Sequence, residues 1–195
     1  MKNKKTLIIL SAAFAVIIAA AGFAYGKLSE KSGMQNNLAS TVEEESAKDN
    51  EDIPKVEMTD FTVTDIDGNS VNFFDFEGKP VIINFWASWC GPCQMEMPDF
   101  EEKYLEYGDK IHFMMINVTD GSRETVDTAK KLIAEKEYTF PVYFDTQLEA
   151  SNIYGIYSLP TTLFVDAQGY GIAQATGMIS GELLQKGIDM IYQAE

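Results

Sequence analysis

Cysteine and histidine are scarce in this chain of 195 residues, which has two cysteines and one histidine. Two cysteines are too few for a secreted scaffold held together by several disulfides. A structural zinc site takes four cysteine or histidine ligands, so we expect no metal site. Gln94 follows the second cysteine, where a c-type haem attachment motif would need histidine. The lone histidine, His112, lies in a predicted strand, and we expect a structural role for it.

Basic residues are in the minority. The chain has 15 lysines and arginines against 30 aspartates and glutamates, which gives a formal net charge of −15 and a pI near 4.4. Such a surface repels the phosphates of nucleic acids, so no nucleic-acid partner is expected. Hydrophobic residues make up 46% of the chain, enough to form the core of a globular domain.

The N-terminal segment, residues 1–26, has the pattern of a membrane anchor or a signal peptide. Lys2, Lys4 and Lys5 precede an uncharged, mostly apolar run over residues 7–25, and positive charge at this end favours a cytoplasmic N-terminus. The run exceeds the roughly 7–15 residues of a signal-peptide core and approaches the roughly 20 of a spanning helix. Its length favours an uncleaved anchor, while Ala19, Ala21 and Ala24 leave cleavage open. Both alternatives place the rest of the chain outside the cytoplasm.

Residues 27–54 have the composition of a flexible linker. They are rich in Ser, Asn, Glu and Lys, include the acidic run Glu43–Glu45, and contain few residues that could be buried. Such a segment cannot offset the entropy lost on ordering. The pattern then changes, and residues 55–195 are predicted to form one globular domain.

The periodicity within residues 55–195 predicts alternating strands and helices. We expect a hairpin around Asp67–Asn69, a buried strand over 81–86, a helix over 91–107, a strand over 111–118, a helix over 123–137 capped by Ser122, a strand over 140–144, a short helix over 148–154, a second hairpin around 166–169, and a last helix capped by Ser180. This order predicts an α/β domain with a central mixed sheet, helices on both faces and an extra N-terminal β-hairpin.

Cys90 and Cys93 are two residues apart at the start of the helix over 91–107, an arrangement suited to disulfide exchange. A helix N-terminus stabilises a thiolate, the nucleophilic form of cysteine. We expect Cys90 to be exposed with a lowered pKa, and Cys93 to be buried, so that it can attack the mixed disulfide formed by Cys90. Pro92 fits the first helical turn, and Trp89 would provide a flat apolar wall. The alternative is a structural disulfide, but so small a loop would contribute only about 2 kcal/mol.

Two motifs resemble the thioredoxin superfamily. Residues 85–93 (FWASWCGPC) resemble its active-site segment, and residues 154–162 (YGIYSLPTT) resemble its second signature. The hairpin over 60–68 and the run over 93–98 (CQMEMP) are similar to the membrane-tethered TlpA and ResA branch of extracytoplasmic thioredoxin-like reductases. The resemblance covers roughly residues 56–193.

The resemblance implies a thioredoxin fold with Cys90 as the attacking and Cys93 as the resolving cysteine. It also implies that Pro160 is cis and faces the thiols, so that the backbone of Leu159 can pair with a substrate strand. Trp89, Gly91 and Pro92 would border the substrate. The Gly91–Pro92 pair is that of cytoplasmic thioredoxins, whereas the tethered branch varies more at these positions.

A second departure concerns the buried acid that cytoplasmic thioredoxins carry on the strand before the active site. Asn84 stands at that position, and Glu96 matches a glutamate implicated instead in the tethered branch. Residues three apart share a helix face, so Glu96 should lie on the Cys93 side and act as a base for that thiol. Replacing it with glutamine should lower the thiol pKa values with little change in thermal stability. The alternative is a surface glutamate stabilised by the helix dipole.

These features predict an extracytoplasmic thiol–disulfide oxidoreductase that reduces disulfides of client proteins, such as apocytochrome c or oxidised repair enzymes. The resemblance implies regeneration by a membrane electron donor of the thiol-transporting type, and the exchange needs no cofactor besides the Cys90–Cys93 pair. Three alternatives remain. They are a thiol oxidase that inserts disulfides, a thiol peroxidase, and a non-enzymatic binding module. A peroxidase would need threonine and proline ahead of its reactive cysteine, and residues 87–89 offer neither.

Overall fold

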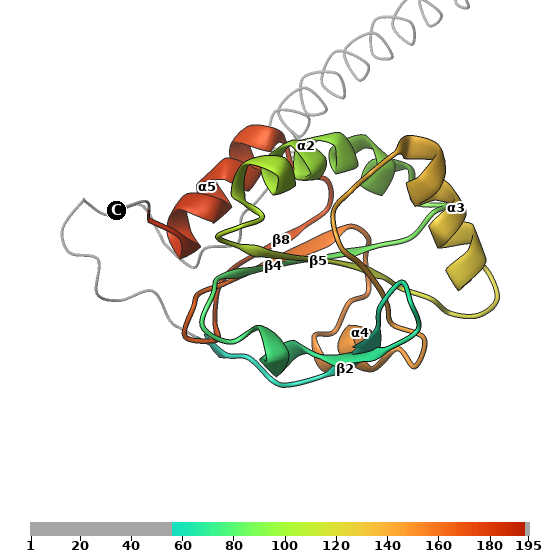
Figure 1. Ribbon diagram of the computed structural model, residues 1–195, viewed down its shortest axis with the longest axis horizontal. Helices are drawn as coiled ribbons and strands as arrows, with labels where there is room; N and C mark the ends of the chain where they lie inside the picture. Colours follow the sequence, from blue (N-terminus) through green and yellow to red (C-terminus); the bar gives the residue numbers. More distant parts are fainter. Residues whose placement is uncertain (1–55, 194–195) are drawn as a thin grey trace, which may run out of the picture. The chain divides into compact units, whose positions relative to one another are not determined.

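The structure is a computed structural model that describes residues 56–193 (Figure 1). The predicted anchor or signal peptide over 1–26 and the predicted linker over 27–54 lie outside the described residues, so both remain predictions. Within residues 56–193, no helix is both long enough and apolar enough to cross a membrane.

Eight strands form one mixed sheet in the order β1-β8-β7-β4-β5-β6-β2-β3. They are β1 (Val56–Glu57), β2 (Thr62–Thr64), β3 (Ser70–Asn72), β4 (Val81–Trp86), β5 (His112–Asn117), β6 (Val142–Phe144), β7 (Thr161–Val165) and β8 (Tyr170–Thr176). β4 runs parallel to β5 and antiparallel to β7. All six residues of β4 are buried, which explains why its sequence is a nearly continuous apolar run.

Helices cover both faces of the sheet, as predicted, but unequally. The helical segments are η1 (Phe73–Phe76), α2 (Gly91–Tyr107), α3 (Val126–Lys136), α4 (Glu149–Ile153) and α5 (Gly181–Ile191). The three long helices α2, α3 and α5 share one apolar cluster with alternate residues of β4, and Figure 1 shows them on the same side of the central strands. The short α4 lies on the other side with β2, over a second cluster that includes Phe85 and Ala150.

The N-terminal hairpin is formed by β2 and β3, as the turn residues predict. Asp65 closes the turn because its Oδ1 accepts hydrogen bonds from the backbone N–H groups of Asp67 at 2.9 Å and Asn69 at 2.8 Å. Gly68 has a φ of +92°, a conformation that glycine adopts without strain. The hairpin joins the sheet where Thr64 pairs with Phe144 of β6.

The predicted start of the helix over 123–137 is wrong. α3 begins at Val126, and Thr125 caps it by accepting a hydrogen bond from the N–H of Thr128. Ser122 is not the cap, because the residues after it form a tight turn around Asp120. The Oδ1 atom of Asp120 accepts three backbone N–H groups, those of residues 122, 123 and 124, at 2.7, 2.8 and 3.0 Å.

Candidate redox site

The two cysteines form a disulfide at the N-terminus of α2, with an S–S distance of 2.06 Å and a Cα–Cα distance of 5.3 Å. Cys90 is the N-cap of the helix, and the backbone N–H of Cys93 points to its Sγ at 3.2 Å. Gly91 and Pro92 occupy the first turn, where the missing N–H of proline costs nothing. The sulfur of Cys90 therefore lies where the helix dipole and the backbone N–H of Cys93 both favour negative charge.

The two cysteine residues differ less in exposure than the sequence predicts. Cys90 is 4% exposed and Cys93 is 0% exposed, so the expectation that Cys90 is an exposed residue is wrong for the oxidised protein. The disulfide explains this, because it joins Cys90 to a sulfur in the apolar core. The residues next to Cys90 in the chain, Trp89, Gly91 and Pro92, are exposed. A client must therefore approach over these three residues.

The second motif supplies a short stretch of free backbone beside the disulfide. The Leu159–Pro160 peptide bond is cis, and the carbonyl of Pro160 accepts the N–H of Gly177 at 2.8 Å. Leu159 packs against the apolar cluster that contains both cysteines. Within the described part of the chain, its own N–H and carbonyl form no hydrogen bond. These groups are available to a bound peptide.

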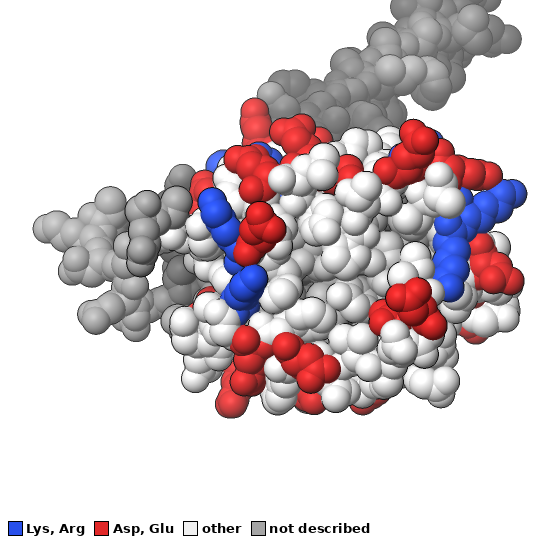
Figure 2. Space-filling model, in the orientation of Figure 1, with Lys and Arg blue, Asp and Glu red and all other residues white. Residues whose placement is uncertain are grey.

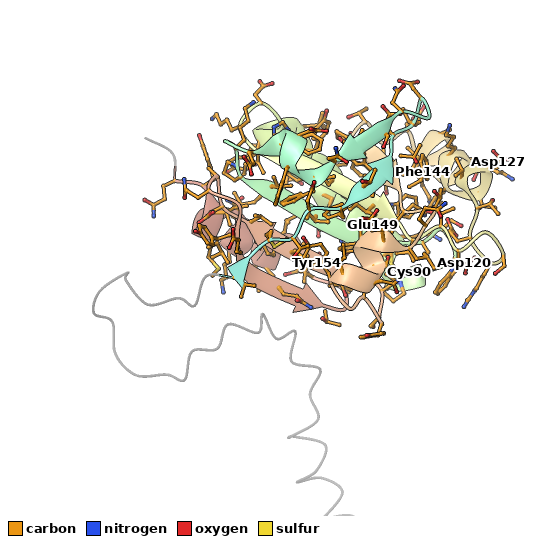
Figure 3. All side chains as sticks on the ribbon, turned by 90° about the horizontal axis from the view of Figure 1, so that it is seen from below. Cys90, Asp120, Asp127, Phe144, Glu149 and Tyr154 are labelled. Carbon is orange, nitrogen blue, oxygen red and sulfur yellow. A yellow bond between two sulfur atoms is a disulfide. The ribbon has the colours of Figure 1, made fainter. Side chains whose placement is uncertain are left out.

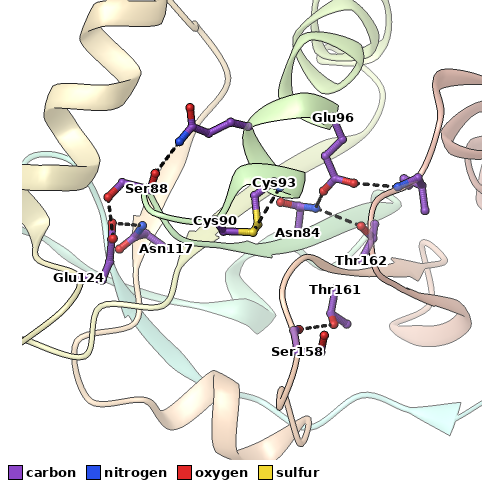
Figure 4. Close-up of a disulfide and its surroundings, with 12 residues drawn as sticks. Asn84, Ser88, Cys90, Cys93, Glu96, Asn117, Glu124, Ser158, Thr161 and Thr162 are labelled. Carbon is purple, nitrogen blue, oxygen red and sulfur yellow. Dashed lines mark hydrogen bonds between the residues drawn. A yellow bond between two sulfur atoms is a disulfide. The ribbon is translucent and has the colours of Figure 1, made fainter.

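Glu96 is buried beneath the site and is not a surface residue of α2. It is 1% exposed, and its two oxygens accept hydrogen bonds from Nδ2 of Asn84 at 2.8 Å and from the N–H of Ile179 at 2.9 Å. Burial raises the pKa of Glu96 to about 7, against the opposing effect of those two hydrogen bonds. Figure 4 shows Glu96 and Asn84 together on the Cys93 side of the disulfide.

Asn84 links Glu96 to the second motif. Its Nδ2 also donates to Oγ1 of Thr162 at 3.0 Å, while its buried Oδ1 has no hydrogen-bond partner among the described residues. The two ends of an amide can exchange places by rotation of the side chain. In that orientation Oδ1 of Asn84 would face Glu96 and could accept a hydrogen bond from the O–H of its protonated carboxyl group. Asn84 can therefore serve either protonation state of Glu96.

A second buried carboxyl near the cysteines was not predicted. Glu124 is 0% exposed and accepts hydrogen bonds from Oγ of Ser88 at 2.7 Å and Nδ2 of Asn117 at 2.8 Å (Figure 4). This position was predicted to lie within the helix over 123–137 and was assigned no role, because a single glutamate carries no local signal of burial. Among residues 56–193, no cluster of three His, Cys, Asp or Glu side chains is arranged to hold a metal ion.

Comparison with known proteins places this site in a family. The model of the AhpC/TSA family matches residues 54–170. The chain belongs to this family. The thiol-disulfide oxidoreductase ResA of Bacillus thuringiensis subsp. konkukian is 34% identical over 131 residues, which are 67% of this chain and 73% of that protein.

Two similar solved structures extend the comparison. StoA from Bacillus subtilis is 25% identical, with a TM-score of 0.58 over 66% of this chain and 96% of its own. The pneumococcal exposed lipoprotein thioredoxin (Etrx1) from Streptococcus pneumoniae is 29% identical, with a TM-score of 0.57 over 67% and 99%. Together with the disulfide, these relatives confirm the predicted thioredoxin fold and the predicted class, a ResA-like thiol–disulfide oxidoreductase.

Proposed function

We propose that this protein reduces disulfide bonds of client proteins outside the cytoplasm. The observation that carries the proposal is the Cys90–Cys93 disulfide at the N-terminus of α2, bordered by exposed Trp89, Gly91 and Pro92. A bridge within one helical turn contributes little as a structural cross-link and is well placed for exchange.

The reaction takes place in two exchanges. In the reduced protein, the thiolate of Cys90 attacks one sulfur of the client disulfide, forms a mixed disulfide and releases the other client sulfur as a thiolate. The thiolate of Cys93 then attacks the sulfur of Cys90 and releases the second client sulfur. The client gains two electrons and two protons, and the protein is left with the Cys90–Cys93 disulfide.

The local geometry assigns roles to the groups around the sulfurs. The N–H of Cys93, which faces the sulfur of Cys90 in the disulfide, would stabilise the thiolate in the reduced form. The free N–H and carbonyl of Leu159 would pair with the client backbone next to its disulfide, and Pro160 would hold that segment in place.

Glu96 would manage the proton of the resolving cysteine. With its pKa at about 7, both the ionised and the protonated forms exist near neutral pH. The ionised form can take up the proton that Cys93 loses when it becomes a nucleophile, and a base is most effective when its pKa lies near the working pH. Its hydrogen-bond partner Asn84 can adapt to the added proton by reorienting its amide.

Location and partners belong to the same proposal. The lysines before the apolar run over 7–25 support an outward-facing domain tethered to the membrane, and a similar solved structure is described as an exposed lipoprotein. A membrane electron donor of the thiol-transporting type would return the disulfide to a dithiol. Apocytochrome c and oxidised repair enzymes are the client classes we propose.

A trapping experiment tests the proposal. The wild-type protein, kept reduced with a thiol, should reduce the disulfides of insulin. Cys90→Ser should be inactive, because it lacks the attacking sulfur. Cys93→Ser should attack once and remain as a mixed disulfide with the client, visible on a non-reducing gel and released by reductant. Trapping by Cys90→Ser but not by Cys93→Ser would reverse the assignment, and inert wild-type protein would refute the function.

A reporter fusion tests the location separately. Alkaline phosphatase joined after residue 54 should be active, because that enzyme needs an oxidising compartment to form its disulfides. Activity of only a cytoplasmic reporter at the same joint would contradict the proposed location and leave the chemistry unaffected.

A further inference from the structure

Two adjacent residues of the β5–α3 connection contact two adjacent residues of the active-site loop. Glu124 accepts the hydrogen bond of Ser88 at 2.7 Å, and the guanidinium carbon of Arg123 lies 3.5 Å from the centre of the Trp89 ring. Ser88 and Trp89 are the two residues immediately before Cys90. The connection therefore holds the approach to the attacking cysteine at two neighbouring points.

The inner contact is a buried network without a cation. Glu124 bridges Ser88 to Asn117 at the end of β5, and Oγ1 of Thr119 donates to Oδ1 of Asn117 at 2.7 Å. Within residues 56–193, no lysine, arginine or histidine forms an ion pair with Glu124. Taking a carboxyl out of water is costly unless it is well hydrogen bonded. Its partners therefore fix its position, and it fixes the position of Ser88 (Figure 4).

The outer contact uses the only arginine of the chain. Arg123 is exposed, and its planar guanidinium covers the ring of Trp89, which remains 42% exposed. The planar guanidinium of arginine can lie flat on an aromatic ring, whereas the compact ammonium group of lysine makes a cation–π contact without this planar stacking. Figure 2 shows one face of the molecule, on which acidic and basic side chains are interspersed.

The connection is itself held in shape. Asp120 accepts the N–H groups of residues 122–124, and these hydrogen bonds, that of Glu124 foremost, lower the pKa of its carboxyl below the usual range. Figure 3 shows Asp120 and Cys90 along the same edge of the molecule. A carboxylate with three backbone donors keeps the turn closed, so that Arg123 points outward and Glu124 points inward.

We propose that residues 120–125, the clamp loop, position Trp89 beside Cys90 for the docking of a client. Arg123 and Glu124 are positioning residues, and neither contacts the reacting sulfurs. The inference rests on the proposed function, because Trp89 is one of the exposed residues over which a client must approach. Loosening the clamp loop should weaken client docking more than the reactivity of the thiols.

Fluorescence quenching tests the clamp without any client. The chain has two tryptophans, and Trp86 is 0% exposed, so acrylamide in solution reports on Trp89. Arg123→Ala should increase quenching by uncovering the ring. Ser88→Ala should also increase it, although Arg123 is still present, because the loop loses its inner contact. Ser70→Ala is the matched control, since this exposed serine lies on β3, outside the clamp loop. Unchanged quenching in Ser88→Ala would overturn the proposal that the clamp loop positions Trp89.

Kinetics with a client provide the second test. Arg123→Ala should raise the KM for insulin by about three-fold, the effect expected from losing one exposed cation–π contact, while kcat changes less. Arg123→Lys keeps the charge but loses the planar stacking, so it should also raise the KM, by less than the alanine variant does. A lysine variant with the wild-type KM would overturn the positioning role. Wild-type protein that leaves insulin disulfides intact would refute the proposed function instead, and the quenching result would still decide the clamp.

Discussion

Replacing Glu96 with glutamine should remove a dependence of stability on pH. The side chain is 1% exposed and accepts hydrogen bonds from Asn84 and Ile179. A glutamine can keep both contacts, because its oxygen can accept the N–H of Ile179 while its amide donates to a reoriented Asn84. Glu96→Gln is therefore a mimic of the protonated glutamic acid, and it should fold with the same contacts.

The magnitude follows from the pKa of Glu96, which burial raises from its ordinary value of 4.5 to about 7. Below pH 4.5 the group is protonated in both the folded and the unfolded chain, and the stabilising effect of its neutral form is fully present. As the pH rises, the unfolded chain loses this proton first, so the free energy of unfolding falls until the folded group ionises near pH 7. The loss amounts to about 3 kcal/mol, at 1.36 kcal/mol for each pKa unit.

Urea unfolding of the oxidised protein between pH 4 and 8 measures this effect. The wild type and Glu96→Gln should be about equally stable at pH 4, and the variant should be more stable by about 3 kcal/mol at pH 8. The sequence-based expectation of little change in thermal stability therefore applies only at acid pH, because Glu96 is buried. Glu102→Gln is the matched control, an exposed residue on the same helix whose replacement should leave the pH profile unchanged. If the difference in unfolding free energy between the wild type and Glu96→Gln were the same at all pH values, the conclusion that burial raises the pKa of Glu96 would be refuted.

Two further predictions concern packing and capping. A Cβ on Gly187 would lie 2.1 Å from Cε1 of Phe164, which is itself fully buried, so Gly187→Ala should destabilise the protein by about 3 kcal/mol in urea unfolding. A Cβ on Gly181 would lie 3.2 Å from its nearest neighbour, Cγ of the Asp99 side chain, so Gly181→Ala should cost less stability. An equal loss of unfolding free energy in Gly181→Ala would contradict this reasoning. Ser180→Ala removes the cap bond to the N–H of Leu183 and should lower the unfolding free energy by about 1 kcal/mol, and an unchanged midpoint would show that the cap is dispensable.

The elements with strong local signals were predictable. β4 is a run of apolar residues, and its predicted bounds of 81–86 match the structure because both faces of the strand are covered. α2 was predicted over 91–107 from the spacing of its inward residues and the cysteine motif, and it has those bounds. The turn of the first hairpin was predicted from Asp67, Gly68 and Asn69, whose turn preference is local.

Three further features that were not predicted share a physical cause, which is contact between separate segments of the chain. β1 is a strand only because Val56 and Glu57 pair with β8. Glu101 of α2 is held by the segment after α3, because its carboxylate accepts the N–H groups of Thr139 and Phe140. Glu124 is buried because Ser88 and Asn117 provide its donors. No periodicity or spacing along the chain reports such partners.

The redox potential of the Cys90–Cys93 pair tests the central claim most directly. Equilibrating the protein with a graded thiol–disulfide buffer, and counting free thiols by alkylation at each step, gives the potential at which half of the protein is reduced. A reductase of client disulfides should have a potential of about −250 mV or below, so that electrons flow from it to the client. A potential of about −120 mV would instead describe a protein that inserts disulfides, and it would contradict the account.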